Sequence, residues 1–115
     1  MQNAAGYPLD PEEMQRRLAV MREAYRAKAP EKIAEIEALW LEACSAGVSA
    51  SGREALVLAV HSMVGSAPTL GCEALGAAAR TLEGALRAAF ACETVAPAGT
   101  AEIGRLIAVL RQSIA

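Results

Sequence analysis

The 115-residue chain has little of what metal sites and nucleic-acid-binding surfaces are built from. It contains one histidine, and its three cysteines, Cys44, Cys72 and Cys92, lie far apart without a Cys-x-x-Cys pair. We therefore expect buried free thiols and no structural metal. The formal net charge is −2 and no block of lysine and arginine stands out, so nucleic acid is not an expected partner.

Long apolar runs are also absent. No stretch approaches the roughly 20 apolar residues that span a bilayer, and the start MQNAAGYPLD has neither the basic residues nor the apolar run of a signal peptide. We expect a soluble, cytoplasmic protein without membrane contact. The sequence shows no glycine-rich nucleotide loop, pair of catalytic carboxylates or Ser/His/Asp set, so we expect no autonomous kinase or hydrolase activity.

Aromatic residues make up 3% of the chain although 54% of it is apolar, so leucine, isoleucine, valine, methionine and alanine must build the core. Such a set favours closely packed helices. No segment alternates apolar and polar residues as a strand does, and no Asn-Gly or Asp-Gly hairpin turn occurs. We predict an all-α fold, an antiparallel four-helix bundle with an additional N-terminal capping helix. It forms a single domain over 10–115 after a flexible stretch, 1–9.

Capping signals and breakers predict five helices. Asp10 and Pro11 would begin the first, with Glu13 at the capping-box spacing, and it would end near Lys28 because Pro30 removes an amide donor. Segments 45–52 and 94–99 have the composition of loops. The four bundle helices are then predicted at about Pro30–Cys44, Arg53–Gly71, Cys72–Ala91 and Thr100–Ile114.

Apolar residues recur at helical spacing in these four helices and define the predicted core. It comprises Ile33, Ile36 and Trp40, with Leu41 as a further candidate; Leu56, Val60, Met63, Ala67 and Leu70; Leu75, Ala78, Ala79, Leu82, Leu86 and Phe90; and Ile103, Leu106, Ile107, Leu110 and Ile114.

The single histidine lies outside this pattern. At 100° per residue, His61 is about 140° from Leu56 around the helix and faces solvent. The residues around it are apolar or small, where lysine, glutamate and glutamine would be usual. Because an exposed apolar patch commonly marks an interaction site, we predict a partner-docking face there. Its residues are Val57, Leu58, Val64, Gly65 and Pro68.

Gly65 follows His61 by one helical turn and leaves the imidazole without a covering side chain. Glycine inside a helix costs stability, which suggests that another molecule approaches closely at this point. A simpler interpretation is equally compatible with the spacing: His61 is an incidental surface histidine, and Gly65 only admits a neighbouring helix.

The string from Ala59 to Gly71, AVHSMVGSAPTLG, resembles the signature of histidine phosphotransfer (HPt) domains. In that signature a histidine precedes an apolar residue, a lysine, Gly-Ser-Ala/Ser and an apolar-Gly pair. The downstream pairs Ala74-Leu75 and Leu82-Glu83 also resemble the family, and the likeness extends from about Glu31 to the C-terminus. The matching signature residues are His61, Met63, Gly65, Ser66, Ala67, Leu70 and Gly71.

The resemblance implies a phosphocarrier in a two-component phosphorelay. His61 would attack a phospho-aspartate on a receiver domain of a hybrid histidine kinase or response regulator, then donate the phosphoryl group to a second receiver. No cofactor of its own is implied, since the receiver would supply the acidic pocket and Mg²⁺. We expect the protein to act as a monomer.

One position departs from the family pattern: Val64 stands where a lysine usually helps to hold phosphoryl charge. Transfer could then be slower, depend on another cation, or be lost. Arg53 and Arg80 are candidate substitutes for that charge, unless both are simply solvated surface residues. Two alternative functions stay open, a phosphorylation-independent adaptor that binds receivers through the same face, and a structural bundle that oligomerises through small-residue faces.

Overall fold

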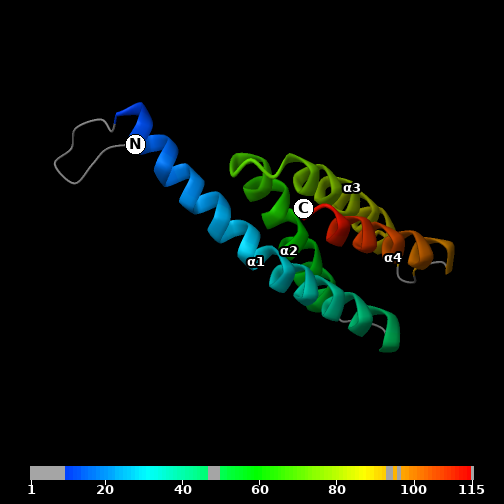
Figure 1. The fold of residues 1–115 in the computed structure, drawn as a ribbon. Helices are drawn as coiled ribbons and strands as arrows, with labels where there is room; N and C mark the ends of the chain where they lie inside the picture. The colour runs from blue at the N-terminus through cyan, green and yellow to red at the C-terminus, as the bar shows by residue number, and fades with distance from the viewer. Residues whose placement is uncertain (1–9, 47–49, 93–94, 96, 115) are drawn as a thin grey trace.

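The computed structural model describes residues 10–46, 50–92, 95 and 97–114, and in these it contains helices and no strand. The helices are α1 (Pro11–Ala46), α2 (Ala50–Thr69), α3 (Glu73–Phe90) and α4 (Pro97–Gln112) (Figure 1). Helix α1 packs on α2 and α4, and α3 packs on the same two helices. This ring of neighbours is the predicted four-helix bundle. None of these helices is long and apolar enough to cross a membrane. The predicted flexible stretch 1–9 lies outside the described residues.

The core follows the predicted apolar stripes closely. Leu41 is the exception: its side chain is 68% exposed, because it lies a quarter turn beyond Trp40 on the outer side of α1. Leu70, Ala78, Phe90 and Ile114, also predicted for the core, are only partly buried. The predicted burial of the three free thiols is wrong, because Cys44 and Cys92 are exposed near helix ends and Cys72 is only partly buried. The buried residues are Ala29, Ile33, Ile36 and Trp40 of α1; Leu56, Val60, Met63 and Ala67 of α2; Leu75, Ala79, Leu82 and Leu86 of α3; and Ile103, Leu106, Ile107 and Leu110 of α4.

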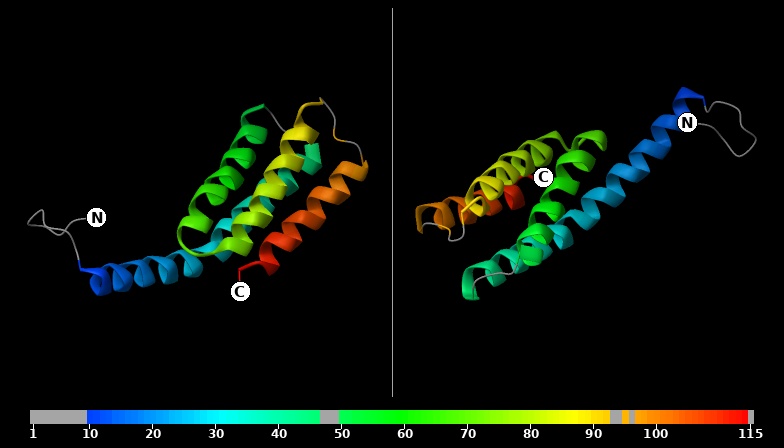
Figure 2. Two further views of the ribbon diagram at one scale, coloured as in Figure 1. Left: turned by 90° about the horizontal axis from the view of Figure 1, so that it is seen from above. Right: turned by 180° about the vertical axis from the view of Figure 1, so that it is seen from behind.

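The predicted helix break at Pro30 is wrong, because α1 continues through this residue from Pro11 to Ala46. Proline removes only its own amide donor and crowds the carbonyl four residues earlier, which bends a helix without necessarily ending it. The left view of Figure 2 shows α1 changing direction between its blue and cyan parts. Packing compensates for the lost hydrogen bond, since the preceding Ala29 and the following Ile33 are both buried in the core.

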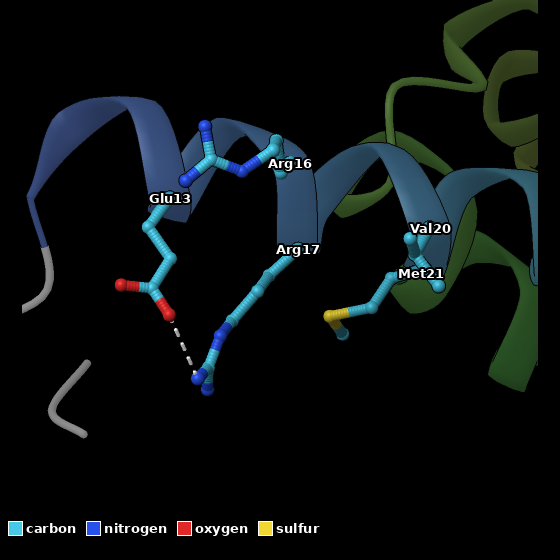
Figure 3. A pocket seen from close by; sticks show the side chains of 5 residues that line it. All are labelled: Glu13, Arg16, Arg17, Val20 and Met21. Atoms are coloured by element: carbon cyan, nitrogen blue, oxygen red, sulfur yellow. Dashed lines mark hydrogen bonds and ion pairs between the residues drawn. The ribbon is translucent and has the colours of Figure 1, made fainter.

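The separate capping helix is therefore also wrong, since residues 11–28 form the N-terminal half of α1. This half begins as predicted at Asp10, whose carboxylate Oδ1 accepts a 2.8 Å hydrogen bond from the Glu13 backbone amide. It then extends away from the other three helices (Figure 1). Figure 3 shows its exposed side, where Glu13 forms an ion pair with Arg17, and Val20 is 69% exposed. The bundle thus uses mainly the C-terminal half of α1.

A tight turn joins α2 to α3. Gly71 has φ +80°, which favours glycine, and its amide donates to the Pro68 carbonyl. The Cys72 amide donates to the Ala67 carbonyl over 2.8 Å, which completes a Schellman motif. Gly76 then lets α3 approach α2, since a Cβ atom at this position would lie 2.6 Å from Cγ of Pro68. The turn and this close contact fix how α3 lies beside α2.

A hydrogen bond between two hydroxyl groups also joins helix α1 to the C-terminal part of α2. The hydroxyls of Tyr25 and Ser66 lie 2.9 Å apart, and Ser66 also donates to the Ser62 carbonyl. Because Ser66 has only one hydroxyl hydrogen, Tyr25 acts as the donor to Ser66. Helix α2 is thus held from α1 on one side and from α3 on the other.

Candidate functional site

His61 lies on α2, and 61% of its side chain is exposed. The ring is nonetheless held by a contact with a second helix, because Nδ1 is 2.7 Å from Oε2 of Glu83 on α3. His61 and Glu83 stand at nearly equal sequence distances on either side of Gly71, so the tight turn brings them to the same level of the α2–α3 pair. The site is therefore built by two helices rather than by the histidine helix alone.

Glu83 is the least exposed member of this site, with 12% of its side chain accessible. Its Oε2 also accepts hydrogen bonds from Nη2 of Arg87 at 2.8 Å and from Nε of Arg87 at 3.2 Å. The Arg87 hydrogen bonds lower the pKa of the Glu83 carboxyl below its usual range, and the His61 hydrogen bond adds to this against the opposing effect of burial. Glu83 is therefore a carboxylate at neutral pH.

The charge on Glu83 fixes the tautomer of His61. A carboxylate has no proton to donate, so Nδ1 of the imidazole must carry the hydrogen of their shared bond. In the neutral ring, Nε2 is then the nitrogen with the free lone pair. An exposed imidazole with an oriented Nδ1 and an unprotonated Nε2 can act as a nucleophile.

Gly65 leaves open space one turn beyond the imidazole. It is exposed, and a Cβ atom built on it would have nothing within 4 Å apart from its own helix. The interpretation that Gly65 admits a neighbouring helix is therefore wrong, whereas Gly76 does have that role towards Pro68. The bundle itself makes no use of the missing side chain at Gly65.

The structure divides the five predicted docking residues into two groups. Leu58, which is 55% exposed, is accessible together with Gly65 and Pro68. Val57 and Val64 are instead partly buried and packed against the core. We define the histidine face as the accessible set with the histidine itself: Leu58, His61, Gly65 and Pro68.

The two predicted charge-supporting arginines lie in different surroundings. Nη1 of Arg53 donates to the Cys92 carbonyl at 3.0 Å, and its guanidinium carbon lies 5.1 Å from the centroid of the Phe90 ring. Arg53 thus holds the start of α2 against the end of α3. Arg80 is exposed on α3, and within the described residues it forms no hydrogen bond or ion pair. Neither contacts His61, and their role stays a prediction.

Sequence reasoning missed Glu83 and Arg87 as site residues. Two features of the sequence could have indicated them. The Glu-x-x-x-Arg spacing pairs opposite charges on one helix face, and the Leu-Gly turn sets α3 antiparallel to α2. In the described ranges, no group of three or more histidine, cysteine or acidic residues could hold a metal ion. The expected absence of a structural metal stays an expectation.

Comparison with known proteins gives one family. The model of the family described as Hpt domain matches residues 12–113, nearly the whole chain. No curated protein and no solved structure matches this chain.

Proposed function

The chain belongs to the Hpt domain family, and from this premise we propose that His61 relays a phosphoryl group between receiver domains. At the family level, Hpt domains are phosphocarriers that use a histidine in two-component phosphorelays and are not kinases. Assigning that role to His61 is the proposal. One observation carries it: the exposed imidazole donates from Nδ1 to Glu83 and so presents Nε2 as a nucleophile.

The chemistry follows from this tautomer. The Nε2 lone pair attacks the phosphorus of a receiver's aspartyl phosphate, the Nε2–P bond forms, and the P–O bond to the aspartate breaks with its electron pair leaving on the carboxylate. The ring gains positive charge, and the Glu83 carboxylate beside Nδ1–H stabilises it. Transfer to the second receiver reverses these bond changes, and Nε2 recovers its lone pair.

The role of the histidine face is to bind the receiver domain. Leu58 and Pro68 offer apolar contact on either side of His61, and the open space at Gly65 lets a receiver approach the ring. The receiver would supply Mg²⁺ and the acidic pocket that neutralise the transferred phosphoryl group. Such a protein needs no cofactor of its own and can act as a monomer in the cytoplasm.

A second candidate function is an adaptor that binds receivers without accepting phosphate. Val64 favours it, because an apolar, partly buried residue occupies the position where the family resemblance expects a lysine beside the histidine. The two functions share the docking face and differ in whether His61 ever becomes phosphorylated.

Phosphoryl transfer from ³²P-labelled receiver domains distinguishes the two functions. Because the chain has one histidine, acid-labile and alkali-stable label that is lost in His61→Gln lies on His61. We expect wild type to become labelled and His61→Gln to remain unlabelled while binding the same receivers. The exposed position should keep the stability change of His61→Gln within about 0.5 kcal/mol. Receivers that bind wild type and never label it would establish the adaptor instead.

A further inference from the structure

A phosphoryl group on His61 would meet negative charge in the protein. A phosphoryl group carries roughly −1.5 to −2 at neutral pH, and the Glu83 carboxylate already lies 2.7 Å from the same ring. The phosphoryl group on Nε2 and the carboxylate at Nδ1 are like charges on opposite sides of one ring, and a cation beside them would offset their repulsion. A positive side chain nearby would therefore stabilise the phosphorylated state of this site.

Helix α2 cannot supply that side chain. Arg53 is its single arginine or lysine, and it lies two turns before His61, with its guanidinium directed to the Cys92 carbonyl and the Phe90 ring. The residue one turn after His61 on the side of α3 is Val64, which packs against the core.

Helix α3 carries a cation beside the His61–Glu83 pair. Arg87 donates two hydrogen bonds, at 2.8 Å and 3.2 Å, to the same Glu83 oxygen that accepts from His61. The guanidinium and the imidazole are thus separated by one shared oxygen atom. A guanidinium has five N–H donors, and the Glu83 contact uses two of them. The side chain is 59% exposed, so the remaining donors can turn towards an anion in solvent.

We propose that Arg87, reaching across from α3, supplies the positive charge that supports the phosphoryl group on His61. This inference rests on the proposed function and adds a residue to it. In the unphosphorylated protein, Arg87 offsets the charge of Glu83 and keeps that carboxylate in place beside Nδ1. In the phosphorylated protein, its unused donors bind phosphoryl oxygens, a geometry that suits arginine better than lysine.

Loading with potassium phosphoramidate tests this role without any receiver domain. The small donor phosphorylates histidine chemically with loss of ammonia, and ³¹P NMR measures the loaded fraction and its decay. We expect Arg87→Met, which keeps most of the apolar stem, to reduce loading about tenfold through the lost charge attraction. Arg87→Lys should retain most of the loading, which separates the charge from the fork geometry.

A relocated charge provides the decisive variant. Val64→Lys combined with Arg87→Met places a cation one turn from His61 on the other helix, and we expect it to recover most of the loading lost in Arg87→Met. Arg105→Met is the matched control, because Arg105 forms a similar short-range ion pair with Glu102 on α4 without a histidine nearby. Loading of that variant should equal wild type. Arg80→Met is the competing variant, because Arg80 is the other candidate cation on α3, and the assignment to Arg87 requires its loss of loading to be much smaller than that of Arg87→Met.

Three results would overturn the role of Arg87. They are loading of Arg87→Met at the wild-type level, absence of recovery with Val64→Lys, and a loss in Arg80→Met in its place. A wild-type protein that phosphoramidate does not load would also overturn it, because no phosphohistidine would exist to be supported. Normal loading of wild type by phosphoramidate with no labelling from any receiver would contradict the proposed relay and leave the role of Arg87 intact.

Discussion

Helix α2 has two faces with opposite properties. On one, Leu56, Val60, Met63 and Ala67 are at most 3% exposed and fill the core. On the other, Leu58 and His61 are more than half exposed, and Gly65 has nothing above it. Packing explains every residue of the buried face. Apart from Pro68, which packs against Gly76 of α3, the histidine face contributes little to packing, so contact with another molecule is left to explain its composition.

The largest expected effect tests the buried face. Leu56→Ala deletes a fully buried side chain and should lower the free energy of unfolding by about 2–5 kcal/mol through lost burial and a residual cavity. Leu58→Ala is the matched control two residues away, and it should change the free energy within about 0.5 kcal/mol. Urea unfolding followed by circular dichroism measures both. Equal losses in the two variants would mean that the faces are not distinct.

A pair of glycines sharpens the comparison. Gly65→Gln adds a side chain over the imidazole in open space, so stability should be unchanged or rise by up to about 1 kcal/mol from better helix propensity. The same side chain would block a docking receiver, and we expect labelling by receivers to fall about tenfold or more because the reacting groups lose their close approach. Measuring unfolding and labelling on one preparation separates the two effects.

The second glycine supplies the contrast. In Gly76→Ala, the added methyl group would lie 2.6 Å from the Pro68 ring, so the α2–α3 contact must shift, and we expect a loss of about 1–3 kcal/mol. A folded Gly65→Gln protein that accepts phosphate as fast as wild type would contradict the docking role of the histidine face.

Local sequence patterns predicted the parts of this structure that depend on local periodicity. The spacing of Leu56, Val60 and Met63 determines which side of α2 is buried, and His61 follows from it on the exposed side. The Leu70-Gly71 pair likewise marks the turn, because a positive φ favours glycine. These properties are set within one helix or one turn.

The errors concern properties set by contacts between helices. Pro30 has the local features of a helix end, yet Ala29 and Ile33 are buried on either side of it and keep α1 continuous. Glu83 and Arg87 become site residues only because α3 packs antiparallel on α2. A sequence read one helix at a time does not show which side chains meet across that contact.

The smallest expected effect concerns the carboxylate that joins the two helices. The pKa of Glu83 is lowered from its usual value of 4.5, first by the Arg87 hydrogen bonds. A carboxyl with a lowered folded-state pKa contributes stability above its unfolded pKa, and this contribution is lost as the pH falls through the folded pKa. The stability that wild type has over Glu83→Gln should therefore be present above the unfolded value near 4.5 and shrink progressively as the pH falls below it.

Glu102→Gln distinguishes the stability contribution of such a carboxylate from its role beside the histidine. The pKa of Glu102 is also lowered by a hydrogen bond, from Arg105, so its variant should show the same pH trend in unfolding. Of these two carboxylates, Glu83 contacts His61 and Glu102 does not. Glu83→Gln should therefore slow labelling while Glu102→Gln should not, because a neutral amide accepts the Nδ1 proton less strongly and stabilises the charged ring less. Equal labelling of the two variants would show that the contact with Glu83 does not orient the imidazole of His61. The reactivity of His61 would then depend on α2 alone.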